Sequence, residues 1–237
     1  MRARRPRQMW VRALVLFLTL LAGCRDDNPT DDGTGTDAFV VRMLPGTHMR
    51  FDYWLLDRLG ARISDSRTTR TWTVVAEDVE AFGFNDAVLV IDSIAGGRVD
   101  TLFFRFSPPG EVYAYGYLAQ LIKRREGREI PPGWDRIAAF SLPPPVTWSV
   151  GFVDSTQTLR AVGETTGEVL FFEVVVNGVR TAIPAREADI SKSNLLASLW
   201  LASSPSVAVR LREDLLSSSA QVAGELSALV SVTTPPS

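Results

Sequence analysis

The chain has 237 residues, of which 46% are hydrophobic, and its 25 lysines and arginines against 27 acids give a net charge of −2. Its six tryptophans and twelve phenylalanines are typical of a packed globular domain and argue against disorder. The basic residues form no stripe along the sequence, so nucleic acid and anionic membrane surfaces are poor partners.

Residues 1–23 have the features of a lipoprotein signal peptide. Five arginines precede the apolar run from Ala13 to Ala22, which ends in Leu21-Ala22-Gly23-Cys24. Positive charge before a short apolar segment is typical of an export signal. Small residues at the last two positions allow the extended backbone to enter a signal peptidase, and a cysteine thiol can form the thioether to diacylglycerol. We therefore predict signal peptidase recognition of Leu21, Ala22 and Gly23, and lipidation of Cys24.

Two other interpretations of this segment are weaker. An uncleaved anchor would need to cross about 30 Å of hydrocarbon, whereas ten or so apolar residues in a helix reach only about 15 Å. An ordinary secretory signal would leave Cys24 as an incidental residue, although it is the sole cysteine of the sequence and stands at the required position. With that thiol lipidated, the mature protein can form no internal disulfide.

Cleavage before Cys24 would remove five arginines and no acid, so the net charge falls from −2 to −7. We predict a protein of the cell envelope that is anchored by lipid, with the periplasmic face of the outer membrane as the favoured location. Residues 24–37 contain five aspartates with Gly, Thr and Pro, and they predict a flexible acidic tether. A calcium loop is the alternative, but the acidic spacing differs from that of such loops and no glutamate closes it.

Period-two alternation dominates from Ala38 onward and predicts strands. Met49, Phe51, Tyr53 and Leu55, for example, share one face of the first strand. The strands expected from this pattern cover residues 49–55, 72–77, 86–94, 99–106, 111–118, 168–176, 179–183, 207–212 and 222–232, within a total of roughly eleven. Gly96-Gly97 and Asn177-Gly178 predict tight hairpin turns between neighbouring strands.

Helical spacing is limited to three short stretches. Residues 118–125 suit one or two turns, and residues 134–138 follow Pro131-Pro132-Gly133 as a short helix start. Residues 195–200 fit either state, and a strand from about Ala197 is favoured. We therefore predict a mainly β fold, in which a single antiparallel sheet curves into an open half-barrel with one or two short helices. One domain covers residues 38–232, with a possible sub-boundary near 143–145 and a loose tail at 233–237.

The sequence contains no catalytic signature. His48 is the single histidine, so neither a zinc site nor a Ser-His-Asp mechanism has its usual partners, and no nucleophile elbow or phosphate-binding loop occurs. The acids on or near predicted strands, which could serve a glycosidase-like mechanism, single out no pair; they are Asp52, Asp57, Asp92, Asp100, Glu168 and Glu173. We expect no enzyme activity, no cofactor and no metal.

Tyr113, Tyr115 and Tyr117 alternate within one predicted strand and are the candidate ligand-binding residues. Three tyrosines on one face suit a groove for sugar, peptide or lipid, although such a stripe also packs under loops. The small residues between them, with Leu118, are the expected core face.

The C-terminal third resembles a known group of proteins. A hairpin at 169–185 is followed by A-D-I at 188–190, L-W-L-A-S-S-P-S-V-A-V-R-L at 199–211 and G-E-L-S-A-L at 224–229. This order is similar to that of the uncharacterised TapB-like periplasmic proteins, and through them to the LolA/LppX-like lipoproteins. The resemblance implies an unclosed half-barrel with helices over its concave face. The sequence departs from the pattern at residues 203–206, where glycines are expected, and it lacks a long plug helix.

Two functional hypotheses follow. In the first, the half-barrel binds an apolar or amphiphilic ligand, or an envelope partner, because an apolar concave face that no helix fills requires a guest. In the second, the sheet is fully packed and the protein is a structural or interaction lipoprotein. A carboxylate-dependent hydrolase is the third possibility. A cavity of several hundred Å³ lined by Phe, Leu and Tyr would favour the first hypothesis.

Overall fold

The computed structural model describes residues 39–107, 110–140, 145–153, 158–192, 195–215 and 222–236. They belong to a compact unit, Ala38–Ser237, which has its own sheet and core, as expected of a domain that folds alone. The elements are β1 His48–Leu56, η1 Ser64–Ser66, β2 Thr68–Ala81, β3 Phe84–Ile94, β4 Val99–Ser107, β5 Glu111–Tyr115, α2 Tyr117–Glu126, β6 Trp134–Ala139, β7 Val146–Val153, β8 Thr158–Thr165, β9 Val169–Val176, β10 Val179–Lys192, β11 Leu195–Ser203, β12 Ser206–Leu215 and β13 Gly224–Thr233.

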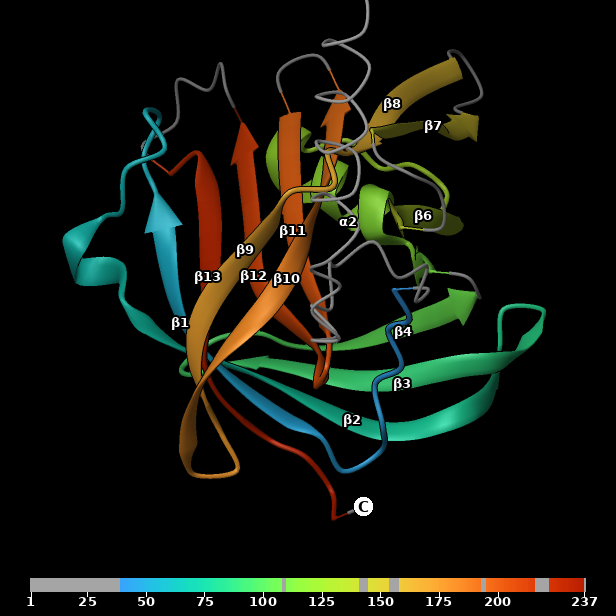
Figure 1. The fold of residues 1–237 in the computed structure, drawn as a ribbon. Helices are drawn as coiled ribbons and strands as arrows, with labels where there is room; N and C mark the ends of the chain where they lie inside the picture. The colour runs from blue at the N-terminus through green and yellow to red at the C-terminus, as the bar shows by residue number, and fades with distance from the viewer. Residues whose placement is uncertain are drawn as a thin grey trace, which may run out of the picture. The chain divides into compact units, whose positions relative to one another are not determined.

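All thirteen of these strands belong to one sheet. Their order is β6-β5-β4-β3-β2-β1-β13-β12-β11-β10-β8-β7, and β9 pairs with both β10 and β13. Neighbours are antiparallel except β9 and β13, which run parallel over two residue pairs. In Figure 1, β2, β3 and β4 curve below α2, while the β9–β10 hairpin crosses diagonally in front of β12 and β13. The first and last described strands, β1 and β13, join the two halves of the sheet.

Two side-chain hydrogen bonds link the ends of this strand order. The indole Nε1 of Trp148 on β7 donates to the carbonyl of Arg136 on β6 (2.9 Å), and the Thr165 hydroxyl on β8 donates to the carbonyl of Ala139 (2.7 Å). The sheet is therefore a curved, barrel-like structure. The predicted fold class, a mainly β protein with one curved sheet and a short helix, is confirmed.

The core lies on the concave side of the sheet and continues into α2. Apolar residues on alternate positions of the first strands, such as Phe51, Trp72 and Val90, are 0–3% exposed. Trp72 makes ring contacts with Phe51 (5.7 Å between centroids) and Phe104 (5.5 Å). Full burial of such a side chain contributes roughly 1.5–3 kcal/mol. The core face of α2, formed by Leu118, Leu121 and Ile122, is 0–1% exposed, so this helix covers part of the concave face.

Two hairpins have two-residue turns in which both central residues have a positive φ, as a type I′ turn requires. Asn177 (φ 48°) and Gly178 (φ 87°) join β9 to β10, which confirms the hairpin predicted from that dipeptide. The second turn was not predicted. Phe82 (φ 51°) and Gly83 (φ 86°) join β2 to β3, and a bulky residue in this left-handed region is uncommon.

Several expected elements differ from the structure. The short helix predicted at 134–138 is wrong, because these residues form β6. The strand predicted over 111–118 ends at Tyr115, and α2 then begins at Tyr117, close to the helix expected at 118–125. Residues 195–203 are strand β11, as favoured. Strands β7 and β8 were not predicted. Most of the possible sub-boundary at 143–145 lies outside the described residues, and a single sheet contains strands from both sides of it.

Candidate functional site

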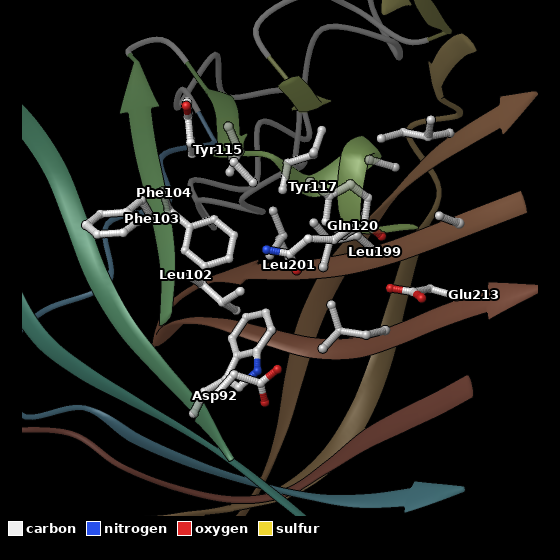
Figure 2. Close-up of a pocket in the computed structure, with 18 of the residues that line it drawn as sticks. Asp92, Leu102, Phe103, Phe104, Tyr115, Tyr117, Gln120, Leu199, Leu201 and Glu213 are labelled. Atoms are coloured by element: carbon white, nitrogen blue, oxygen red, sulfur yellow. The ribbon is translucent and has the colours of Figure 1, made fainter. Parts of the chain in front are cut away.

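A cavity of about 50 Å³ lies inside the curved sheet, between α2, the strands β2–β5 and the strands β10–β12. Figure 2 shows Leu102 and Phe104 extending from β4 toward Leu199 and Leu201 on the opposite wall, with Asp92 and Glu213 at its edges. Most of the lining is apolar, and its charged residues are the pairs Arg70–Asp92 and Arg124–Glu213, together with Arg98. We call this space the inner cavity.

One ion pair of the inner cavity is fully built into the sheet. Arg70 on β2 donates from Nε to Asp92 Oδ1 (2.8 Å) and from Nη2 to Asp92 Oδ2 (2.6 Å), and its Nη1 donates to the Ser227 hydroxyl (3.1 Å). Burial opposes the charge of Arg70, but the hydrogen bonds and charge of Asp92 outweigh burial and raise the pKa of Arg70 above its ordinary value. Arg98 also approaches Asp92, at 3.7 Å. A buried pair of this kind holds both side chains in fixed positions.

A second ion pair connects α2 to the sheet. Arg124 Nη2 donates to both carboxylate oxygens of Glu213 on β12, at 2.9 Å each. Burial opposes the arginine charge, but Glu213 and Glu225 outweigh it, so the pKa of Arg124 is raised. Tyr117, the first residue of α2, also lines the inner cavity, and burial and then Glu213 raise its pKa above the ordinary range. Its hydroxyl therefore stays protonated at neutral pH.

Three side-chain nitrogens of residues that line the inner cavity have no hydrogen-bond partner among the described residues. These are the Trp72 indole Nε1, the Arg98 Nε and the Arg124 Nε, all of which are buried; the Arg98 Nε is ion-paired with Asp100. Trp200 Nε1 is also buried without a partner, but Trp200 does not line this cavity.

A groove of about 470 Å³ lies outside the inner cavity, between α2, the end of the β2–β3 hairpin and β4. Phe82, Phe103, Tyr115 and Ile130 supply its apolar surface, and Gln120 and Lys123 are among its polar residues. Phe103, Tyr115 and Gln120 line both this groove and the inner cavity. The two spaces therefore adjoin at these three side chains. We call the larger one the outer groove.

Phe82 is the most exposed aromatic residue of the outer groove, at 51%. Its ring stacks on Tyr115 (3.5 Å between centroids, 4° between planes) and contacts Phe103 edge-on (5.2 Å). Its carbonyl accepts a hydrogen bond from Trp134 Nε1 (3.3 Å). Left-handed backbone costs a non-glycine residue about 1–2 kcal/mol, and such strain is concentrated at functional sites.

The position of α2 depends on its first turn. Gly116 precedes the helix with φ 66°, and its N–H donates to the carbonyl of Gly133 (2.7 Å). Asp135 on β6 accepts a hydrogen bond from the Leu118 N–H (2.9 Å) and so satisfies one of the free donors of the helix N-terminus. Burial raises the pKa of Asp135 to about 6, although the bond from Leu118 opposes this.

The three candidate tyrosines do not share one strand face. Tyr113 and Tyr115 lie on the same face of β5, but Tyr117 is in α2, so that part of the prediction is wrong. Tyr115 and Tyr117 nevertheless line the inner cavity. Tyr113 lies in neither space; its hydroxyl donates to Glu111 (2.8 Å), which also accepts from Arg136. The predicted core face, with Val112, Ala114 and Leu118, is buried.

Only some of the remaining candidate residues lie within the described ranges. Leu21, Ala22, Gly23 and Cys24, and the predicted tether, lie outside the described residues. His48 is exposed beside Thr73, with Nδ1 3.1 Å from the threonine hydroxyl. Within the described ranges, no group of three His, Cys, Asp or Glu residues is placed to hold a metal ion, and no helix is long and apolar enough to cross a membrane.

The acids considered for catalysis are dispersed. Asp92 and Asp100 are cross-strand partners, and both contact Arg98. Burial and then Asp189 and Glu168 raise the pKa of Glu187 to about 7, but Glu187 lines neither the inner cavity nor the outer groove. Asp135, whose pKa is also raised, is bonded to the start of α2.

The sequence did not identify Arg70, Trp72, Arg124 and Glu213 as residues that line the inner cavity. Arg70 stands two residues before Trp72 and therefore shares its apolar face, and Asp92 follows Val90 in the same way. Charged residues on the same strand faces as buried apolar residues were therefore the sequence signal that could have indicated a buried ion pair.

The fold and the two adjoining spaces define a mainly β protein with one curved sheet and a partly covered interior. No family model and no curated relative match this chain. Among solved structures, the chain is similar to a Bacteroides fragilis protein with a YmcC-like fold, which is described as a proposed exported protein. The two sequences are 10% identical and the TM-score is 0.33. The match covers 83% of this chain and 100% of the other. A likeness at this level assigns no function.

Proposed function

We propose that this chain is a lipid-anchored protein of the cell envelope that binds an amphiphilic ligand in the outer groove and the inner cavity, without catalysing a reaction. The observation that carries the proposal is the shared lining: Phe103, Tyr115 and Gln120 belong to both spaces. A ligand in the outer groove would contact these three side chains.

The dimensions of the two spaces decide how such a ligand would lie. The inner cavity of about 50 Å³ is too small for a drug-sized molecule or an acyl chain, whereas the outer groove of about 470 Å³ is within the range of ligand sites. The main body of the ligand therefore belongs in the outer groove, against Phe82, Phe103 and Tyr115. Only a small end group enters the inner cavity.

The envelope location and the anchor rest on the N-terminal sequence. Five arginines, a short apolar run and the Leu21–Cys24 motif support export and lipidation, with the periplasmic face of the outer membrane as the proposed site. One acyl chain binds membranes only marginally, so a stable anchor requires the two or three chains that lipoproteins carry. A ligand near this protein would then be a molecule of the envelope.

The absence of catalysis is supported by the state of the interior acids. Asp92 accepts two hydrogen bonds from Arg70, and Glu213 accepts two from Arg124. Carboxylates held in this way are structural anchors for arginine and are poorly placed to exchange protons with a substrate.

The alternative function, a structural or interaction lipoprotein, is favoured by a different observation. The core face of α2 covers part of the concave face, and the remaining inner cavity is small. In that case the exposed aromatic residues of the outer groove would contact another envelope protein. The resemblance to TapB-like and LolA/LppX-like proteins is compatible with either function.

The binding proposal is tested by native mass spectrometry of residues 38–237, incubated with a total lipid extract of bacterial envelopes. We expect retained amphiphile with the native unit. Thr101→Trp, which fills the outer groove from an exposed position on β4, should abolish retention. Thr181→Trp, at an exposed position on β10 outside the groove, is the matched control and should retain the ligand. No retention by any form, or equal retention by both variants, would contradict the proposal.

A further inference from the structure

One edge of strand β9 has no partner strand over most of its length. On one side, β9 pairs with β10 at every residue from Val169 to Val176. On the other side, it pairs with β13 only at Val175 and Val176, near the hairpin turn (Figure 1). Among the described residues, no strand pairs with residues 169–173 on that second side. We call this segment the open edge.

The hairpin determines which backbone groups of the open edge point outward. In a two-residue hairpin, the residues that flank the turn form a hydrogen-bonded pair, and bonded and non-bonded pairs then alternate along the strands. The pair of Phe171 with Pro184 is therefore non-bonded, which suits a proline because it has no N–H. Asn177, in the same phase as Phe171, donates its N–H to a carbonyl of β13 (2.9 Å). Val169, Phe171 and Glu173 therefore direct their N–H and C=O groups away from β10.

The side chains of the open edge are apolar and exposed. Phe171 is 71% exposed, Val169 42% and Leu170 36%. Leu170 shares a strand face with Val174, which is 2% exposed, so β9 leaves the core toward its first residue. Exposed edges usually carry a lysine, a proline or a bulge that blocks pairing with another strand. The open edge has none of these, because residues 169–172 are all apolar and β9 pairs with β10 without a register shift.

We infer that the open edge of β9 pairs antiparallel with the open edge of a second copy of this chain, around a two-fold axis at Phe171. In this register Phe171 faces its own symmetry mate, and Leu170 faces Phe172 of the second copy. Val169 faces Glu173. Each pair of outward-directed residues then exchanges both of its hydrogen bonds. This assembly goes beyond the proposed function and does not depend on it.

A second copy matches the open edge in length. Strand β9 begins at Val169, and Gly167 (φ 81°) turns the chain just before it. In the inferred register, the residue opposite Val175 is Gly167 of the second copy. The second strand therefore ends where β13 begins to pair with β9, so the two do not compete for the same edge.

A second copy also matches the open edge in charge. Glu173 is its one charged residue, and Arg180 of the same hairpin lies 3.5 Å away. The two-fold axis places an apolar residue opposite Glu173, so no like charges face each other. The other facing pairs are aromatic or aliphatic, and such cross-strand pairs stabilise a sheet. An isologous contact of this kind needs a single surface that is complementary to itself.

The test is sedimentation velocity of residues 38–237 over a range of concentrations. Two short edges form a smaller interface than the 1,200–2,000 Å² or so of a stable complex, so we expect a Kd of roughly 1–100 µM. Between about 1 and about 300 µM, the native unit should change reversibly from monomer to dimer. A unit that stays monomeric at the highest concentration would overturn the inference.

Charge at the centre of the register tests which surfaces meet. Phe171→Lys places like charges opposite each other and should weaken dimerisation about tenfold or more, and Phe171→Glu should do the same. An equimolar mixture of these two variants should dimerise again, because a lysine then faces a glutamate. Val179→Lys is the matched control, since Val179 is 66% exposed on β10, and it should dimerise as the native unit does. A dimer that Phe171→Lys does not weaken, or that the mixture does not restore, would exclude this register.

Cross-linking provides a second measurement at the same position. Residues 38–237 contain no cysteine. Facing residues of a hydrogen-bonded antiparallel pair have Cα atoms about 5.5 Å apart, which is within the range of a disulfide. Mild oxidation should therefore link Phe171→Cys into covalent dimers and leave Val179→Cys monomeric. Equal cross-linking of both variants would show that the copies meet without the inferred pairing.

Discussion

The two halves of the sheet contribute different side chains to the inner cavity. Strands β2–β5, with α2, supply aromatic and charged residues, among them Trp72, Phe104 and Arg70. Strands β10 and β11 supply a wall of aliphatic residues such as Ala188 and Leu199. These residues of both halves are at most 8% exposed, so burial does not distinguish them. The first half therefore supplies most of the polar groups of the lining, and the second supplies most of its aliphatic surface together with Glu213.

The largest expected effect concerns the buried charge of the first half. Arg70→Met would leave Asp92, 1% exposed, without its main partner, and we expect a loss of about 3–5 kcal/mol in the free energy of unfolding. Urea denaturation measures this loss. The double variant Arg70→Met with Asp92→Leu removes both charges and should recover most of it. A single variant as stable as the native unit would show that the pair is not buried as described.

Asp135, which accepts a hydrogen bond from the start of α2, should make the free energy of unfolding depend on pH. Because its pKa is raised from 3.8 to about 6, the folded protein binds this proton more tightly than the unfolded chain does. Stability therefore falls as the pH rises from about 4 to 6. Asp135→Asn, which keeps an acceptor for the Leu118 N–H, should be more stable than the native unit at pH 8 by on the order of 1–3 kcal/mol.

Denaturation curves at several pH values test this expectation. The advantage of the asparagine variant should disappear below about pH 4, where the native carboxyl is also neutral. An advantage that does not change with pH would mean that Asp135 is not the group responsible.

A larger side chain in the aliphatic wall of β10 and β11 tests how this wall limits the inner cavity. Ala188→Leu should cost about 1–3 kcal/mol of stability, because Ala188 is 1% exposed, and it should also weaken ligand binding by filling the inner cavity. Ala202→Leu is the control, because Ala202 is fully buried but does not line the cavity. It should cost similar stability with little change in affinity. Equal losses of affinity in both variants would indicate a general distortion of the sheet.

The smallest expected effect on stability is at the turn of the outer groove. Phe82→Asn would relieve left-handed strain of about 1–2 kcal/mol and give this turn the Asn-Gly sequence of residues 177–178. It would also lose the stack on Tyr115, which is worth about 0.5–1.5 kcal/mol. The two terms nearly cancel, so thermal denaturation should change little, while amphiphile binding weakens. A large gain in stability with unchanged binding would show that Phe82 has no role in the groove.

Hairpin turns and strand faces were the features that the sequence predicted best. Asn177-Gly178 specified its turn because both residues tolerate a positive φ, and alternation located the buried face of β1. The helix predicted at 134–138 failed for a physical reason. Residues 137–139 are all buried, so alternation disappears, and the spacing of Trp134, Ile137 and Ala138 then also fits a helix.

The candidate site could be predicted only in part. Tyr115 and Tyr117 reach the inner cavity from a strand and from a helix, which the tyrosine alternation alone does not reveal. The pairing of Arg124 with Glu213 joins residues 89 positions apart and depends on the tertiary fold. The in-phase charges of Arg70 and Asp92 were visible in the sequence, but their partners were not.

The most direct measurement follows the indole N–H groups of residues 38–237, which contain five tryptophans, by ¹H–¹⁵N NMR during titration with decanoate. The proposal of a ligand in the outer groove predicts that the Trp134 Nε1–H resonance moves, because this group donates to the carbonyl of Phe82 at the groove, while the Trp200 resonance stays in place. A Trp134 resonance that does not move at saturating decanoate would contradict it.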